Sequence, residues 1–198
     1  MENWLTGSRE TAMGSSTDAA LIVFAWGNES RGDDAIGPLL ARRLAELNRP
    51  GLVVIEDHQL NIEHVMDFEG RTPLVFIDAS VGIDSGFRVS RIGPSADGNF
   101  STHAISPQAL LNVYQESVGA ELPEAYLLEI AGSRFDLGEH LSAAATEALE
   151  SAWEFLETTF RRPASHWGAV LLEVSQGPLP HAGLQVCLLY TSPSPRDL

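Results

Sequence analysis

The sequence predicts an α/β fold: a three-layer α/β/α sandwich with a mostly parallel central sheet. Short apolar runs without polar alternation, typical of strands covered on both faces, recur along the chain. Segments with the apolar spacing of amphipathic helices separate these runs. Alternating elements of this length favour parallel strands joined by right-handed crossovers, with helices on both faces of the sheet.

The first half of the chain shows this alternation. Ala20–Trp26 is an unbroken apolar run that stops at Gly27, and apolar residues then recur at helical spacing from Asp34 to Leu47. Two more short apolar runs, separated by a short helical stretch, predict two further strands. In chain order, these three segments are residues 52–56, 62–68 and 74–77.

The second half predicts two more strands and two helices. Residues 87–92 form a weaker candidate for an edge strand, and residues 125–130 a strong candidate for the last strand. Ser106 followed by Pro107 is a typical cap and first-turn proline for a helix that continues through Val118. Ser142 is expected to cap a long amphipathic helix.

One domain is expected, at residues 19–162. Residues 1–18 are polar and rich in Ser, Thr and Gly, which predicts a flexible leader. Residues 163–198 hold 5 of the 11 prolines and show no amphipathic period, so we expect an irregular tail. Because it ends in VCLLYTSPSPRDL, typical of a translated cloning artefact, we expect the tail to be partly non-native; the alternative is a flexible native tail.

The charge composition excludes several functions. The chain has 27 acidic and 12 basic residues, all 12 of them arginine, for a net charge of −15. The absence of lysine excludes a phosphate-binding GKS loop, a Schiff-base lysine, and kinase or receiver-domain sites that need an ammonium group. The acidity argues against binding to nucleic acid or anionic membranes, so a protein or small-ligand partner is expected. The stretch 116–157, with ten acids and one arginine, is expected to be a solvated face far from the site.

The chain also predicts a cytoplasmic protein. Its single cysteine, Cys187, offers no disulfide framework and no metal-binding CxxC pair. No signal-peptide pattern and no apolar run long enough to span a bilayer are present in the sequence.

Polar residues at predicted strand ends are the candidates for chemistry, because ligands of open α/β sheets bind beyond the carboxyl ends of the strands. Asp33 and Asp34 follow the first strand, Asp78 follows the third, and His103 precedes a helix. Asp33 is expected to cap the first helix. Asp34, Asp78 and His103 come from three loops and suit a divalent-metal site with open positions, for which zinc, nickel and iron remain possible.

Three other kinds of functional site match the sequence less well. A dinucleotide site would use Gly27 and Gly32 with Asp57 as the ribose acid, but GxGxxG is not matched. A receiver-domain site would need a lysine, which this chain lacks. A serine hydrolase would use Ser30, but Asn28 stands where the first glycine of GxSxG belongs.

The motifs AWGNESRGDDAIGP, FIDAS and STHAIS together resemble those of the NiFe-hydrogenase maturation proteases. The resemblance covers roughly residues 20–160. The stretches EDHQLNIEH and DLGEHLS look most like the branch that serves soluble NAD-reducing hydrogenases.

This resemblance implies a three-layer α/β endopeptidase, often grouped with the aspartic type, that removes a C-terminal peptide from a hydrogenase large-subunit precursor after nickel insertion. By the same resemblance, Asp34, Asp78 and His103 would bind nickel carried by the substrate and would serve catalysis. The alternatives are a non-enzymatic metal-dependent chaperone of the precursor and a small-ligand enzyme on the same fold.

Overall fold

A five-stranded sheet forms the centre of the molecule. The computed structural model describes residues 20–95, 105–119 and 121–177. The strands are β1 (Ala20–Trp26), β2 (Leu52–Asp57), β3 (Arg71–Ser80), β4 (Phe87–Ile92) and β5 (Ala125–Ala131). They lie in the order β2-β1-β3-β5-β4, and only β4 runs antiparallel to its neighbour. The predicted mostly parallel sheet, with residues 87–92 at an edge, is confirmed.

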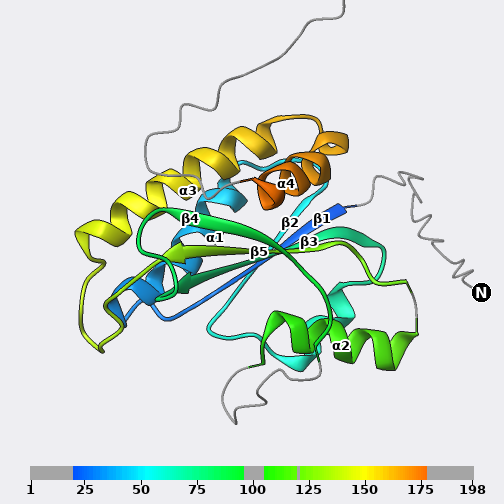
Figure 1. Ribbon diagram of the computed structural model, residues 1–198, viewed down its shortest axis with the longest axis horizontal. Coiled ribbons are helices and arrows are strands. Elements are labelled where there is room, and N and C mark those ends of the chain that lie inside the picture. The colour runs from blue at the N-terminus through cyan, green and yellow to red at the C-terminus, as the bar shows by residue number, and fades with distance from the viewer. Residues whose placement is uncertain (1–19, 96–104, 120, 178–198) are drawn as a thin grey trace, which may run out of the picture.

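Helices α1 (Ile36–Glu46), α3 (Ala143–Arg161) and α4 (Trp167–Gln176) cover one face of this sheet (Figure 1). Their apolar sides pack with one set of strand side chains into the larger core cluster, which includes Leu40, Leu149 and Phe160. The spacing of apolar residues in α1 and α3 therefore correctly predicts which face of each helix is buried.

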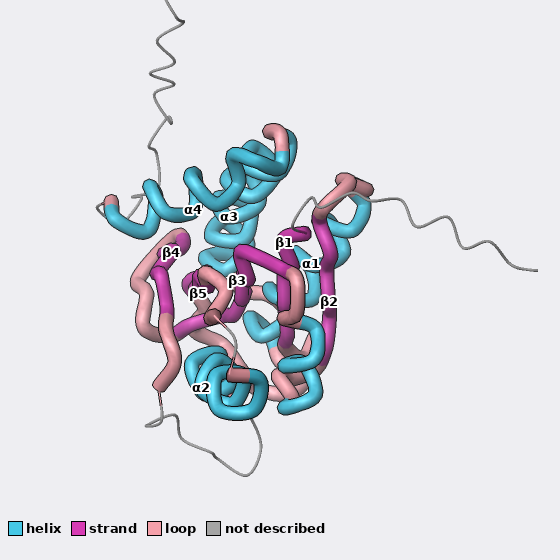
Figure 2. The backbone as a smooth tube through the Cα atoms, turned by 90° about the vertical axis from the view of Figure 1, so that its right-hand side faces the viewer, coloured by secondary structure: helices cyan, strands magenta, loops and turns pink. Residues whose placement is uncertain are grey.

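The opposite face is covered by α2 (Pro107–Val118) and the 3-10 helix η2 (Ile62–Asp67), so Figure 2 shows the strands between two helical layers. Phe24, Phe68 and Phe76 are buried in the second core cluster beneath these helices. Because consecutive strand residues point to opposite faces, two cores on one sheet require strands that are apolar throughout. The predicted α/β/α sandwich is confirmed.

Both predicted helix caps are present. The Ser106 hydroxyl accepts a hydrogen bond from the N–H of Ala109 at 3.2 Å, and Pro107 begins α2. The Ser142 hydroxyl accepts from the N–H of Ala145 at 3.1 Å at the start of α3. Each cap satisfies a backbone donor that the first helical turn leaves without a partner.

The chain beyond Pro163 differs from the expected irregular tail. Residues Ala164–His166 form the short 3-10 helix η3, and α4 follows directly. Trp167 and Leu171 of α4 are each only 1% exposed, and the Trp167 ring meets Phe160 edge-on at 5.3 Å. The prediction of irregular structure is therefore wrong for residues 164–176, because this short helix packs Trp167 and Leu171 into the core. None of the helices in the described part of the chain has the length and hydropathy needed to span a membrane.

Candidate active site

The candidate site lies where the parallel strands end. Since β2, β1, β3 and β5 run in the same direction, the loops that follow them meet at one edge of the sheet. The loop after β1 carries Asp34, β3 carries Asp78 near its end, and residues 132–142 connect β5 to α3. This edge is where ligands of open α/β sheets bind.

Gly27 shapes the first of these loops. Its φ of +147° suits glycine, and a Cβ at this position would overlap the carbonyl oxygen of Asp34. The next residue, Asn28, donates its backbone N–H to Oδ2 of Asp34 at 3.0 Å. The glycine thus lets the loop fold back on the aspartate, and the Asn28 amide orients the partly exposed carboxylate.

Asp78 lies close enough to Asp34 for the two carboxylates to interact. Burial raises the pKa of Asp78 to about 7, and the negative charges of Asp34 and Glu129 contribute to the rise. The N–H of Ala79 offsets a smaller part of it. The structure therefore brings together two of the three predicted site residues. The third, His103, lies outside the described residues.

Glu129 is a site residue that sequence reasoning missed. It is paired with Asp78 in the register of β3 and β5. It accepts hydrogen bonds from the Ser80 hydroxyl at 3.2 Å and from the Arg88 guanidinium at 2.6 and 2.9 Å. Its position as the one acid in the apolar run AYLLEI was the available signal. The expectation that the acidic stretch lies far from the site is wrong at this residue.

Asp33 does not cap the first helix, so that prediction is wrong. Its side chain is completely buried and accepts four hydrogen bonds from the segment that follows β5. The donors are the backbone N–H groups of Ser133, Arg134 and Ser142, at 2.8, 3.0 and 2.7 Å, and the Ser142 hydroxyl at 3.0 Å. Burial alone would raise the pKa of Asp33, but these hydrogen bonds hold it below its ordinary value.

Backbone hydrogen bonds extend this connection between the loops after β1 and β5. Gly138 donates its N–H to the carbonyl of Ser30 at 2.7 Å, and Asp33 donates its N–H to the carbonyl of Arg134 at 2.7 Å. Gly32 donates to the carbonyl of Glu139 at 3.1 Å. Gly32 also has a φ of +56°, and a Cβ there would collide with the Arg134 carbonyl oxygen. The loop bearing Asp34 and the 132–142 segment therefore form one connected unit.

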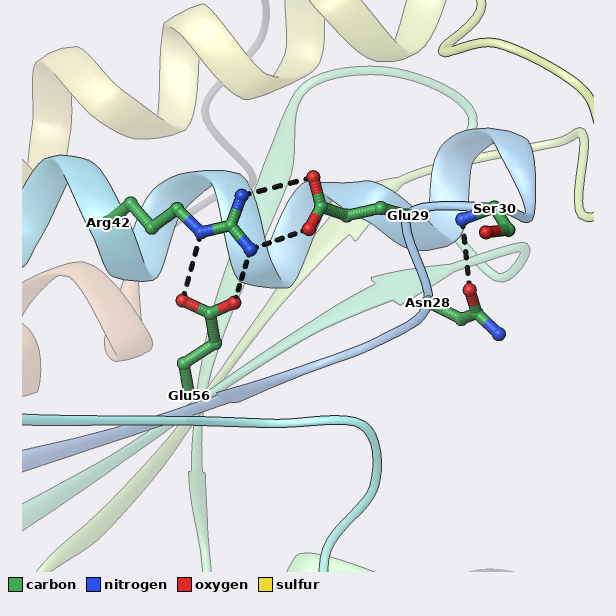
Figure 3. A network of polar contacts seen from close by, with 5 residues as sticks. All are labelled: Asn28, Glu29, Ser30, Arg42 and Glu56. Carbon is green, nitrogen blue, oxygen red and sulfur yellow. Dashed lines mark hydrogen bonds and ion pairs between the residues drawn. The ribbon is translucent and has the colours of Figure 1, made fainter.

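An arginine anchors the other side of the first loop. Figure 3 shows Arg42 of α1 between Glu29 and Glu56, with hydrogen bonds to both carboxylates. The Arg42 hydrogen bonds lower the pKa of Glu29. Beside them, the Ser30 N–H donates to Oδ1 of Asn28 at 2.9 Å. The loop is thereby tied to α1 and to the end of β2, although ion pairs this exposed contribute little to stability.

The remaining candidate acid, Asp57, is engaged in local structure. Its Oδ2 accepts from the Asn61 side chain at 3.1 Å and lies 3.4 Å from Nε2 of His64. These contacts fix the turn into η2 and do not support the ribose-binding role considered for Asp57.

Two neighbouring carboxylates can take a divalent cation or hold a proton between them. Burial is the main cause of the raised pKa of Asp78, and repulsion from Asp34 adds to it; a bound cation would relieve that repulsion, so the donor chemistry fits a metal. Among the residues that the structure describes, no group of three His, Cys, Asp or Glu side chains is placed to hold a metal ion by itself. A complete ligand set would need a donor from outside the described residues or from a partner.

Solved structures share this fold. The NiFe hydrogenase maturation protease HycI from Thermococcus kodakarensis aligns with a TM-score of 0.58 and 24% identity, covering 73% of this chain and 94% of its own. The endopeptidase HycI from Escherichia coli aligns with a TM-score of 0.55 and 21% identity, covering 73% and 93%. The hydrogenase maturating endopeptidase HybD from Escherichia coli gives 0.54 and 21%, covering 72% and 92%. No protein-family model and no curated protein matches the sequence.

Proposed function

We propose that this chain is an endopeptidase of the NiFe-hydrogenase maturation type, which removes the C-terminal peptide of a hydrogenase large-subunit precursor after nickel insertion. The observation that carries the proposal is the proximity of Asp34 and Asp78 at the carboxyl edge of the sheet. The sequence motifs around both residues resemble those of the maturation proteases, and solved members of that group share the fold. The partner is then a protein, consistent with a chain of net charge −15.

Nickel belongs to the substrate in this proposal. The carboxylates of Asp34 and Asp78, with His103 as a third donor, would bind a metal ion that the precursor presents. Binding a cation between the two carboxylates would offset their repulsion, so association would depend on prior metal insertion.

The bound metal would supply Lewis-acid activation of the scissile carbonyl. Within the chain itself, Asn28 orients Asp34 through its N–H, while Glu129 stays engaged with Arg88 and Ser80. Asp78, whose pKa is raised by burial to about 7, would accept a proton from an attacking water. An aspartic-type classification would follow if this carboxylate chemistry carries the reaction. A cytoplasmic location fits the single cysteine.

The test is incubation of the protein with nickel-loaded and with nickel-free large-subunit precursor, followed by mass spectrometry of the subunit. Loss of the C-terminal peptide from the nickel-loaded form alone is the expected result. Asp34→Asn, Asp78→Asn and His103→Ala should each abolish cleavage without unfolding the protein.

Asp84→Asn is the matched control for Asp78→Asn. Asp84 is an exposed acid in the loop that follows β3, so the same chemical change should leave cleavage intact. Full cleavage by Asp78→Asn would overturn the assignment of this carboxylate. Nickel-dependent binding of the precursor without any cleavage would instead identify the metal-dependent chaperone.

A further inference from the structure

Large apolar side chains are exposed on loops at the same edge of the sheet as the carboxylates. The exposed large apolar residues of the described chain are Ile62, Met66, Val81, Val118 and Leu137. Val81 and Leu137, each 78% exposed, lie in the loops that follow β3 and β5, and those loops border the edge carrying Asp34 and Asp78. Val118 ends α2, and the chain then leads into the amino end of β5, so it belongs to the opposite edge. Large apolar side chains exposed on one edge of a protein can mark a protein-binding surface.

Hydrogen bonds connect both loops to the carboxylate site. The chain reaches Val81 directly after Ser80, whose carbonyl accepts the N–H of Gly132 at 3.0 Å. Leu137 precedes Gly138, which donates its N–H to the carbonyl of Ser30 in the Asp34 loop. The buried Asp33 carboxylate adds four hydrogen bonds to the same 132–142 segment. Val81 and Leu137 are therefore carried by loops that are fixed relative to Asp34 and Asp78.

An apolar side chain on an anchored loop is suited to docking, because little backbone freedom remains to be lost on binding. The centre of this surface is acidic: Asp34 and Glu129 each lie near enough to Asp78 to act on it electrostatically. Asp34 has no cationic side chain bonded to it among the described residues, whereas Glu129 is paired with Arg88. A complementary partner would present a cation surrounded by apolar protein surface. A precursor with an inserted metal ion would present this central charge, whereas a metal-free precursor would lack it.

We infer that Val81 and Leu137 form a docking surface for the large-subunit precursor. The two side chains would contact apolar surface of the precursor around its metal site. The inference rests on the proposed function and deepens it, since it assigns substrate recognition to residues outside the carboxylate set. On this view, the carboxylates recognise the metal and the two apolar side chains recognise the protein that carries it.

The experiment compares Val81→Ser, Leu137→Ser and the double variant with the wild-type protein, using purified nickel-loaded precursor. Serine removes the apolar surface without adding charge. Each single change should raise KM about ten-fold, equivalent to about 1.4 kcal/mol of binding, and leave kcat nearly unchanged. The double variant should raise KM about a hundred-fold if the two contacts are independent. Thermal unfolding should be unaltered, because both side chains are exposed.

Val118→Ser is the matched control, since it removes an exposed valine at the other edge and should leave KM unchanged. If Val81→Ser and Leu137→Ser both keep the wild-type KM while the wild-type protein cleaves the precursor, the docking surface is overturned and the proposed function stands. An equal rise in KM for Val118→Ser would overturn it too, because the effect would not be local. A wild-type protein that neither binds nor cleaves the nickel-loaded precursor would overturn the proposed function, and the docking surface with it.

Discussion

Asp33→Asn should destabilise the protein by about 3–5 kcal/mol at pH 7. Oδ2 of Asp33 accepts three hydrogen bonds and Oδ1 accepts one, in a fully buried position. Asparagine has a single acceptor oxygen, so its NH2 group would face at least one donor. The change loses a hydrogen bond to a charged group, about 1.5–3 kcal/mol, and leaves a buried donor without a partner, about 1–3 kcal/mol. The remaining bonds also lose their charge assistance.

Urea unfolding at pH 7 and at pH 3 measures this effect. The folded-state pKa of Asp33 is lowered, so its contribution is complete above the unfolded pKa of about 3.9 and is lost as the pH falls through the folded pKa. The difference between wild type and variant should therefore narrow below about pH 4. Asp136→Asn, an exposed acid in the same segment, is the matched control and should change stability by less than about 0.5 kcal/mol. A loss below about 1 kcal/mol for Asp33→Asn, or a difference that persists undiminished at pH 3, would refute the four-bond interpretation.

Two further predictions concern Asp78 and α4. The pKa of Asp78 is about 7 in the folded protein against about 3.9 in the unfolded chain, so the folded state binds more protons between these values and stability falls as the pH rises through them. By urea unfolding, Asp78→Asn should remove this loss and be about 2–4 kcal/mol more stable than wild type at pH 8, but equal to it at pH 3, below the unfolded pKa; equal stability at pH 8 would contradict the raised pKa. Trp167→Ala should cost about 3–5 kcal/mol, because the side chain is buried against Phe160 and its Nε1 donates to the Arg162 carbonyl at 3.0 Å. The half-buried Trp153 is its control, and an equal loss for Trp153→Ala would argue against α4 as part of the core.

Local sequence patterns predict most of the regular structure. The apolar run at β1 is predicted at its observed bounds, and both serine caps lie where the Ser–Pro pair and the amphipathic period place them. These features depend on residues within a few positions of one another. Asp34 and Asp78 could be selected in the same way, because each follows an apolar run and strand ends converge in a parallel sheet.

Long-range contacts explain the errors. Asp33 has the local signature of a helix cap, but its hydrogen-bond partners lie about 100 residues further along the chain. In the sequence, Glu129 is one acid within an acidic stretch. Only the register of β3 and β5 shows that it is paired with Asp78. The helix α4 is short and follows a proline, so only the burial of Trp167 and Leu171 identifies it as part of the core.

The class of fold, the order of its elements and the absence of lysine chemistry follow from composition and residue spacing, because these features are encoded locally. The construction of the site depends on long-range packing. Packing buries Asp78 near Asp34, which raises the pKa of Asp78. It also buries Asp33 as the connection between two loops, and it leaves Val81 and Leu137 exposed on loops at the edge that carries the carboxylates. Proximity, burial and exposure depend on which distant segments pack together, and these properties set the electrostatics and the binding surface of the site.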